Sequence, residues 1–227
     1  MTSEKLKDAF MNLAEPSISS AVIILILVAL IITIYIFIRN FIEKKRASHR
    51  RIQVMSNMDE LTHLYKRKFF ETLIEAELER AKRHERSLSC AVIEIDNIDE
   101  IKEKYGDQFC DSIVQDIGEI FTDDTRIHDI CARFGKYSFI SLMPESDMDS
   151  ALFASKRLMG LIQRCKFDLE GTNDSISVTV SIGIVTCHEY FAEELTTEKV
   201  FEMAGQALQV AKEKGGDRVE FFVNNNS

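Results

Sequence analysis

The chain has 227 residues, of which 45% are hydrophobic and 29% are charged. This length accommodates one well-cored domain with an accessory segment, and the lack of low-complexity sequence excludes a largely disordered protein. The net charge is -9, and residues 52–227 carry -13 once the -1 of residues 1–15 and the +5 of residues 16–51 are set apart. Because so acidic a body is a poor match for a phosphate backbone, we expect no nucleic acid partner.

Residues 16–38 form the strongest break in composition, because they contain no charged residue. A helix of this length spans the roughly 30 Å apolar core of a bilayer, and the segment lacks the basic leader and cleavage site of a signal peptide. Basic residues directly follow it, namely Arg39, Lys44, Lys45, Arg46, Arg50 and Arg51. The positive-inside rule therefore predicts a non-cytoplasmic tail at 1–15, one transmembrane helix at 16–38, and a basic, helical cytoplasmic linker at 39–57.

Helical and strand patterns alternate along the rest of the chain. Apolar residues at helical spacing predict helices at 66–86, 97–105, 108–121, 147–166 and 197–213. Apolar β-type runs predict strands at 88–95, 175–186 and 218–223, and a hairpin spans 132–144 around a short turn. This order predicts an α/β (α+β) fold with a central mixed sheet flanked by helices.

The five cysteines are widely spaced and have no CxxC pair; they are Cys90, Cys110, Cys131, Cys165 and Cys187. All of them lie among apolar residues. We expect buried, reduced thiols, with neither a zinc site nor a disulfide framework.

Five segments carry a family resemblance: DELTHLYKRKFF (59–70), EIDNIDEIKEKYGDQFCD (94–111), RIHDICARFGKYSF (126–139), VSIGI (180–184) and AKEKGGDR (211–218). Their order and spacing resemble the GGDEF domain of diguanylate cyclases over about residues 58–223. The resemblance implies a nucleotidyl-cyclase-like, five-stranded mixed sheet flanked by helices. It also implies the family's reaction, in which a dimer condenses two GTP molecules into cyclic di-GMP with Mg²⁺. For this chain we expect a bacterial-type inner membrane, and either a homodimer or a heterodimer with another protein.

The signature turn of that family reads Gly-Gly-Asp/Glu-Glu-Phe, and here it has become Gly135-Lys136-Tyr137-Ser138-Phe139. A tyrosine hydroxyl, with a pKa of about 10, is a poor replacement for a carboxylate that holds a hard cation. Lys136 also brings a long side chain to a position where glycine lets the backbone approach phosphate. We therefore expect no catalytic residue and no cofactor, with Mg²⁺ needed only if cyclase activity remains.

The resemblance also aligns the rest of the nucleotide site with this chain. Lys102 replaces an asparagine that reads guanine, and Gly216 replaces an arginine that binds phosphate. Glu94 stands at the metal aspartate and would be a metal ligand only if activity is retained. Asp111 and Lys212 match an aspartate that reads guanine and a lysine that contacts phosphate. The alternative is that Glu94, Asp111 and Lys212 are ordinary surface residues.

Arg126 and Asp129 match the Arg-x-x-Asp product site that many of these cyclases carry ahead of the turn. Arg157 lies where a second arginine often assists. Arginine grips phosphate with two hydrogen bonds and stacks on guanine, so these three residues are the predicted cyclic di-GMP site. The alternative for Arg126 and Asp129 is a local ion pair before a strand.

The residues together favour a membrane-anchored, catalytically inactive member of this family that binds cyclic di-GMP as a receptor or regulator. Two alternatives stay open. One is a protein-interaction module that uses the cyclase dimer surface and binds no nucleotide. The other is a residual diguanylate cyclase.

Overall fold

The computed structural model describes residues 32, 33, 35, 39, 57–169, 174–190 and 195–223. The chain divides into two compact units, Met1–Ser56 and Asn57–Ser227. The predicted transmembrane helix lies outside the described residues, apart from positions 32, 33 and 35. The predicted linker also lies outside them, apart from residues 39 and 57. Among the described residues, no helix has both the length and the apolar character needed to cross a bilayer.

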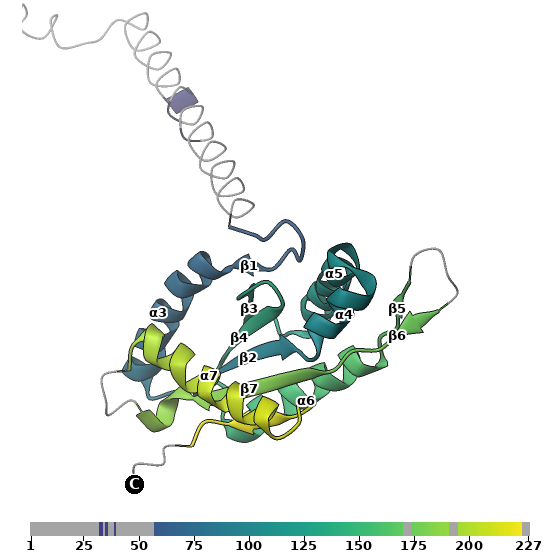
Figure 1. Cartoon of the computed structure of the whole chain (residues 1–227). Coiled ribbons are helices and arrows are strands. Elements are labelled where there is room, and N and C mark those ends of the chain that lie inside the picture. Colours follow the sequence, from purple (N-terminus) through teal and green to yellow (C-terminus); the bar gives the residue numbers. More distant parts are fainter. Residues whose placement is uncertain are drawn as a thin grey trace, which may run out of the picture. The chain divides into compact units, whose positions relative to one another are not determined.

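The central sheet has six strands in the order β1-β3-β4-β2-β7-β8 (Figure 1). Their bounds are Tyr65–Lys66 (β1), Leu88–Ile95 (β2), Ile130–Arg133 (β3), Ser138–Pro144 (β4), Val180–Thr186 (β7) and Val219–Phe221 (β8). β2 pairs with β4 and β7 in antiparallel fashion, whereas β1 lies parallel to β3 and β8 lies parallel to β7. The sheet is therefore mixed, as the sequence predicts.

The expected number of five strands is wrong, because β1 adds a sixth at the sheet edge. β1 has two residues, too few to show a strand pattern, and only its parallel pairing with β3 defines it. The single strand expected at 175–186 is also divided. Its first part, β6 (Ser175–Ile176), pairs with β5 (Phe167–Asp168) in a separate ribbon, whereas β7 pairs with β2 and β8. The chain changes partners between the two strands, which interrupts the ladder.

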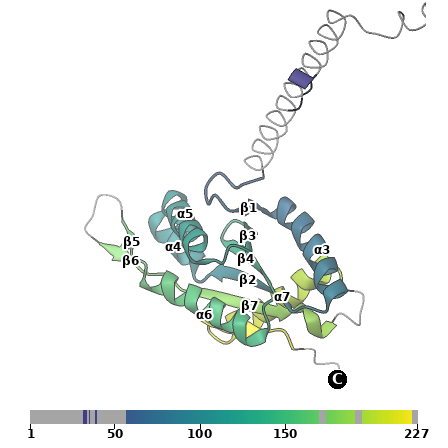
Figure 2. The same ribbon diagram turned by 180° about the vertical axis from the view of Figure 1, so that it is seen from behind.

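Two cores lie on opposite faces of the sheet, because successive side chains of β2 alternate between them. Cys90 and Val92 belong to the core covered by α3 (Arg67–His84) and α7 (Thr197–Glu213). Ala91 and Ile93 belong to the core covered by three other helices, α4 (Ile98–Tyr105), α5 (Asp107–Asp124) and α6 (Met148–Arg164). α7 lies in front of the sheet in Figure 1 and α6 lies in front of it in Figure 2.

Gly183 brings α7 against β7. A Cβ atom at this position would lie 2.1 Å from the Leu208 backbone nitrogen and 2.3 Å from the Ala204 carbonyl oxygen. Only glycine allows so close an approach. The position of α7 matters for the site, because this helix carries Lys212.

All five cysteines are free thiols, and four of them are buried. The expectation of burial is wrong for Cys165, which is only partly buried. This residue is the C-cap of α6, where the chain leaves the covered face of the sheet.

Candidate functional site

The turn that begins at Gly135 lies beside the end of β2. Glu94 is paired in register with Ser138 of β4 on one side and with Ser181 of β7 on the other. The next residue, Ile95, donates its backbone N–H to the Tyr137 carbonyl oxygen at 3.2 Å. The sheet therefore makes Glu94 a direct neighbour of the turn, as the family resemblance implies.

Lys212 reaches Glu94 from α7, and its Nζ lies 2.7 Å from Glu94 Oε1. Both side chains are partly exposed, at 41% for Lys212 and 33% for Glu94. Two of the three predicted nucleotide-site residues thus come together, but as an ion pair with each other. The carboxylate that a metal would need already has an internal cation.

The third of these residues, Asp111, lies on α5 one turn after Asp107. It lines a hollow of about 580 Å³ together with Tyr105 and Phe109, whose rings meet edge to face at 5.3 Å. The lining of this hollow includes neither Glu94 nor Lys212. Asp111 therefore shares no contact with Glu94 or Lys212 in the lining of this hollow.

Lys136 of the turn is held by an aspartate at the start of α5. Its Nζ lies 2.6 Å from Asp107 Oδ1, and Lys102 Nζ lies 3.2 Å from the same oxygen. The Tyr137 hydroxyl also donates to this oxygen, at 3.4 Å. The hydrogen bond from Lys136 is the largest cause of a lowered pKa of Asp107, and the hydrogen bond from Lys102 is the next largest. The hydrogen bond between Lys136 and Asp107 also raises the pKa of Lys136. Two lysine side chains therefore share the one carboxylate of Asp107.

Arg133 fixes the backbone of the turn. Its guanidinium donates to the Lys136 carbonyl oxygen at 3.0 Å and to Asp59 at 3.1 and 3.3 Å. Burial raises the pKa of Asp59, but hydrogen bonds from Thr62 and the Arg133 charge outweigh it, so the net shift is downward. The sequence analysis missed Asp59, Arg133 and Asp107. In the sequence, Asp59 begins the DELT segment, Arg133 precedes the turn, and Asp107 directly follows Gly106.

The loop after α7 offers no cation at the position of the family's arginine. Gly216 has a φ of +73°, and a Cβ here would lie 3.1 Å from Asp96 Oδ1. The Asp96 carboxylate instead accepts the Asp217 N–H at 3.0 Å and the hydroxyls of Thr179 and Ser181 at 2.7 Å each. Asp96 therefore anchors this loop to the end of the sheet.

The residues around the turn do not fit the Mg²⁺ that the family resemblance implies. The family resemblance places carboxylates at Tyr137 and Ser138, where this chain has none, and Glu94 is paired with Lys212. Throughout 57–169, 174–190 and 195–223, no three His, Cys, Asp or Glu side chains are grouped as a metal ion would need. Hard divalent cations require several oxygen ligands, mostly anionic.

A second site surrounds Arg126 and Asp129, which line a hollow of about 500 Å³. The Arg126 backbone N–H donates to Asp129 Oδ2 at 3.1 Å. Within the described part of the chain, no hydrogen bond engages the Arg126 guanidinium. Burial raises the pKa of Asp129, against the opposing effects of the Arg126 backbone hydrogen bond and of the Arg126 and Arg157 charges.

The same hollow contains two arginines that the sequence analysis missed. Arg80, near the end of α3, pairs with Glu77 at 3.0 Å, and Arg86 pairs with Glu145. Both precede Arg126 by about 40 residues or more in the chain. No local pattern links them to Arg126, since only the fold places α3 beside residues 126–129.

Arg157 lies outside this hollow. Its Nε is 2.9 Å from Asp124 Oδ1, and its Nη2 donates to the Asp124 carbonyl oxygen at 2.8 Å. Arg157 and Asp124 line a crevice of only about 20 Å³, and Asp129 lines both spaces. Asp129 therefore stands between the two predicted arginines.

Residues 56–218 match the family described as diguanylate cyclase, GGDEF domain. Diguanylate cyclase DosC of Escherichia coli K12 is 29% identical over 165 residues, which are 73% of this chain and 35% of that protein. Diguanylate cyclase DgcP of Pseudomonas aeruginosa is 33% identical over 162 residues, 71% of this chain and 23% of that protein. The matched region is therefore about a third or less of these relatives' length.

Two solved structures share the fold. The GGDEF domain of DgcB from Caulobacter crescentus, in complex with c-di-GMP, superposes with a TM-score of 0.69 at 21% identity, covering 74% of this chain and 94% of that one. Diguanylate cyclase SiaD of Pseudomonas aeruginosa, in complex with its activator SiaC, gives 0.80 at 22% identity, covering 96% and 82%. With a family match over most of its length and this fold, the chain belongs to the GGDEF domain family.

Proposed function

We propose that this chain is a catalytically inactive GGDEF protein that acts in cyclic di-GMP signalling as a receptor, with Arg126 and Asp129 as its ligand site. The observation that carries the proposal is the contrast in charge pairing between the two sites. At the turn, Lys136 and Glu94 are engaged by other side chains of the protein. At the second site, the guanidinium of Arg126 lines an open hollow and is available to a ligand.

The loss of catalysis follows from the lost metal ligands. Condensing two nucleotides requires a metal that polarises phosphate and activates a hydroxyl. Ser138 and Tyr137 supply no carboxylate, and removing Lys212 from Glu94 would leave one acid where several oxygen ligands are needed. Residual cyclase activity is therefore the weaker alternative.

The chemistry of the hollow supports a ligand with phosphates and guanines. A volume of about 500 Å³ lies within the usual range of small-molecule sites, roughly 300–1,000 Å³. Arginine forms paired hydrogen bonds with phosphate and stacks on aromatic rings. Asp129, which accepts hydrogen bonds when ionised, suits the N–H groups of a guanine edge. Arg157 would join the site by exchanging its contact with Asp124 for a ligand phosphate.

Relatives named diguanylate cyclases, and the DgcB structure with bound c-di-GMP, support this choice of ligand. The test is calorimetric titration of the full chain with cyclic di-GMP, in mild detergent because of the apolar residues 16–38. We expect micromolar binding that Arg126→Ala weakens at least tenfold, or about 1.4 kcal/mol. The matched control is Arg83→Ala, an exposed arginine of α3 outside the lining of the hollow.

Two other results would replace the proposal. Absent binding in both the parent chain and Arg126→Ala would favour the interaction module that uses the cyclase dimer surface. Equal binding in both would place the ligand away from Arg126 and overturn the proposed site. Formation of cyclic di-GMP and pyrophosphate from GTP by the purified chain in the presence of Mg²⁺, measured by chromatography, would establish the residual cyclase.

We also propose that residues 16–38 anchor the chain in a bacterial-type inner membrane with the GGDEF domain in the cytoplasm. The support is the uncharged stretch of sequence and the basic residues that follow it. Alkaline carbonate extraction of membranes tests the anchor, since a spanning segment stays in the pellet. Release into the supernatant would contradict it.

A further inference from the structure

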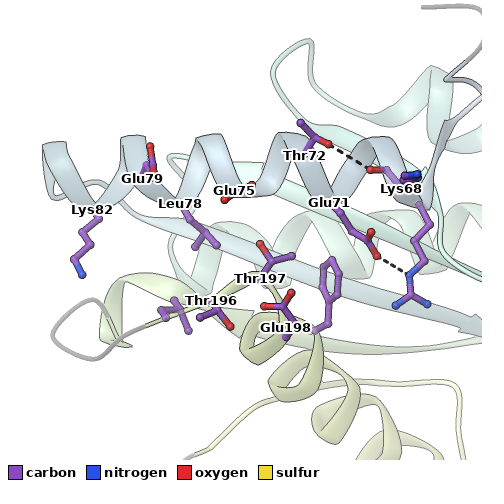
Figure 3. A pocket seen from close by; sticks show the side chains of 13 residues that line it. Lys68, Glu71, Thr72, Glu75, Leu78, Glu79, Lys82, Thr196, Thr197 and Glu198 are labelled. Carbon is purple, nitrogen blue, oxygen red and sulfur yellow. Dashed lines mark hydrogen bonds and ion pairs between the residues drawn. The ribbon is translucent and has the colours of Figure 1, made fainter.

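A groove of about 820 Å³ runs along α3 and past the start of α7 (Figure 3). It lies on a different side of α3 from the Arg126 hollow, because the two spaces share no lining residue. Its lining consists of Arg67, Lys68, Glu71, Thr72, Glu75, Leu78, Glu79, Lys82, Leu195, Thr196, Thr197, Glu198 and Phe201.

The middle of the groove is acidic, whereas Arg67, Lys68 and Lys82 lie toward the two ends of its α3 side. Glu71 is paired with Arg67, whose Nε lies 3.0 Å from it and whose guanidinium also covers the Phe134 ring. Glu75 and Glu79 are exposed, and neither forms an ion pair with any residue that the structure describes. A backbone hydrogen bond, followed by one from the Thr196 hydroxyl, lowers the pKa of Glu198, which keeps it ionised at neutral pH.

The floor of the groove is apolar. Leu78 is only 7% exposed, and Figure 3 shows it pointing from α3 toward Thr196. Leu195 and Phe201, both half-buried, continue this floor from the α7 side. The lining residues of α3 extend over about 22 Å at about 1.5 Å per residue, which is the length of about four helical turns.

Two occupants are disfavoured by the charges. A metal ion would need converging acids, and no such group of three occurs among the described residues. A second copy packing its α3 antiparallel in a register centred on Glu75 would place Glu75 against Glu75 and Glu71 against Glu79. Like charges face to face oppose association, and the chain as a whole carries -9.

We propose that this groove docks a basic amphipathic helix of a protein partner. Lysines or arginines of that helix would meet Glu75, Glu79 and Glu198, while its apolar residues rest on the Leu78 floor. Helix-in-groove recognition commonly combines such apolar anchors with complementary charge, which fixes orientation and speeds encounter. This surface is independent of the proposed ligand site, so neither proposal depends on the other.

The test is a charge exchange measured by fluorescence anisotropy with the full chain in mild detergent. The probe is a labelled helical peptide of about four turns, with leucines along one stripe and lysines on both sides of it. A second peptide carries glutamate in place of every lysine. We expect the lysine peptide to bind, and the double variant Glu75→Lys/Glu79→Lys to weaken it at least tenfold, or about 1.4 kcal/mol. The same variant should bind the glutamate peptide better than the parent chain does.

The matched control is Glu100→Lys/Glu103→Lys, which reverses two exposed charges on α4 outside the groove. This control changes the net charge by the same amount as Glu75→Lys/Glu79→Lys. Because its two positions lie outside the groove, it should leave the affinity for the lysine peptide within about twofold. Equal weakening of peptide binding by both double variants would show that net charge alone causes the effect. That result would overturn the proposed docking in the groove. Saturable binding that neither variant changes, or no binding up to about 1 mM, would also overturn it. Sedimentation of the parent chain as a dimer that Glu75→Lys/Glu79→Lys breaks would assign the groove to a second copy instead.

Discussion

The turn that begins at Gly135 and the Arg126 hollow are both rich in cations, yet not all of these cations are paired with carboxylates. At the turn, Lys136 and Lys102 share Asp107, and Arg133 is held by Asp59. In the hollow, Arg80 and Arg86 are likewise paired with carboxylates, whereas the Arg126 guanidinium has no hydrogen-bond partner within the described residues. The comparison teaches that a basic side chain is available to a ligand only where an internal carboxylate is not already paired with it.

Removing Phe139 should have the largest effect, because this turn residue belongs to the core. Its ring is fully buried and stacks on Phe121 with centroids 5.1 Å apart. We expect Phe139→Ala to lower the free energy of unfolding by about 3–5 kcal/mol, measured by urea denaturation. Ile127→Ala is the counterpart in the second site, where the side chain is 91% exposed. It should change stability by less than about 0.5 kcal/mol. Similar losses in both variants would mean that the turn has no special structural role.

Replacing one arginine from each site should give the next largest contrast. Arg133→Ala removes hydrogen bonds to Asp59 and to the Lys136 carbonyl, so we expect a loss of about 2 kcal/mol at pH 7. Arg126→Ala should cost less than about 0.5 kcal/mol, since the guanidinium makes no such bond among the described residues. Urea denaturation of both variants measures the difference.

The Arg133 contribution should also depend on pH in a defined direction. The pKa of Asp59 is held below its usual value of 3.8 in the folded chain. The stability from its ionised form is therefore present above that value and is lost as the pH falls through the lower, folded-state pKa. The gap between the parent chain and Arg133→Ala should accordingly narrow below about pH 4. A gap that stays constant would show that Asp59 is not the partner that matters.

The smallest effect should come from Lys136→Ala. The Lys136 contact is the main cause of the lowered pKa of Asp107, so the pKa should rise toward 3.8 without reaching it, because Lys102 remains. Carboxyl chemical shifts followed by NMR during a pH titration measure this change. Thermal stability should hardly alter, since exposed ion pairs contribute little. Lys104→Ala, an exposed lysine of α4, is the control and should leave the pKa of Asp107 where it is.

Most elements of the fold follow from local pattern. The strand at 88–95 and the helix at 197–213 have the observed bounds, because long periodic runs record which face is buried. β1 and the division of 175–186 were not predicted. A two-residue strand has no period, and the partner of each segment is chosen by distant residues.

The candidate sites divide in the same way. The sequence by itself determined which groups are present: a turn without acids and an Arg-x-x-Asp segment. Only the tertiary structure decided which of these groups are already paired. Lys212 and Glu94 are 118 residues apart in the chain, and Lys136 and Asp107 are 29 residues apart. Each pair nevertheless forms a contact in the folded protein. Whether a charge faces a ligand or an internal partner depends on contacts between elements, and such contacts leave no local mark on the sequence.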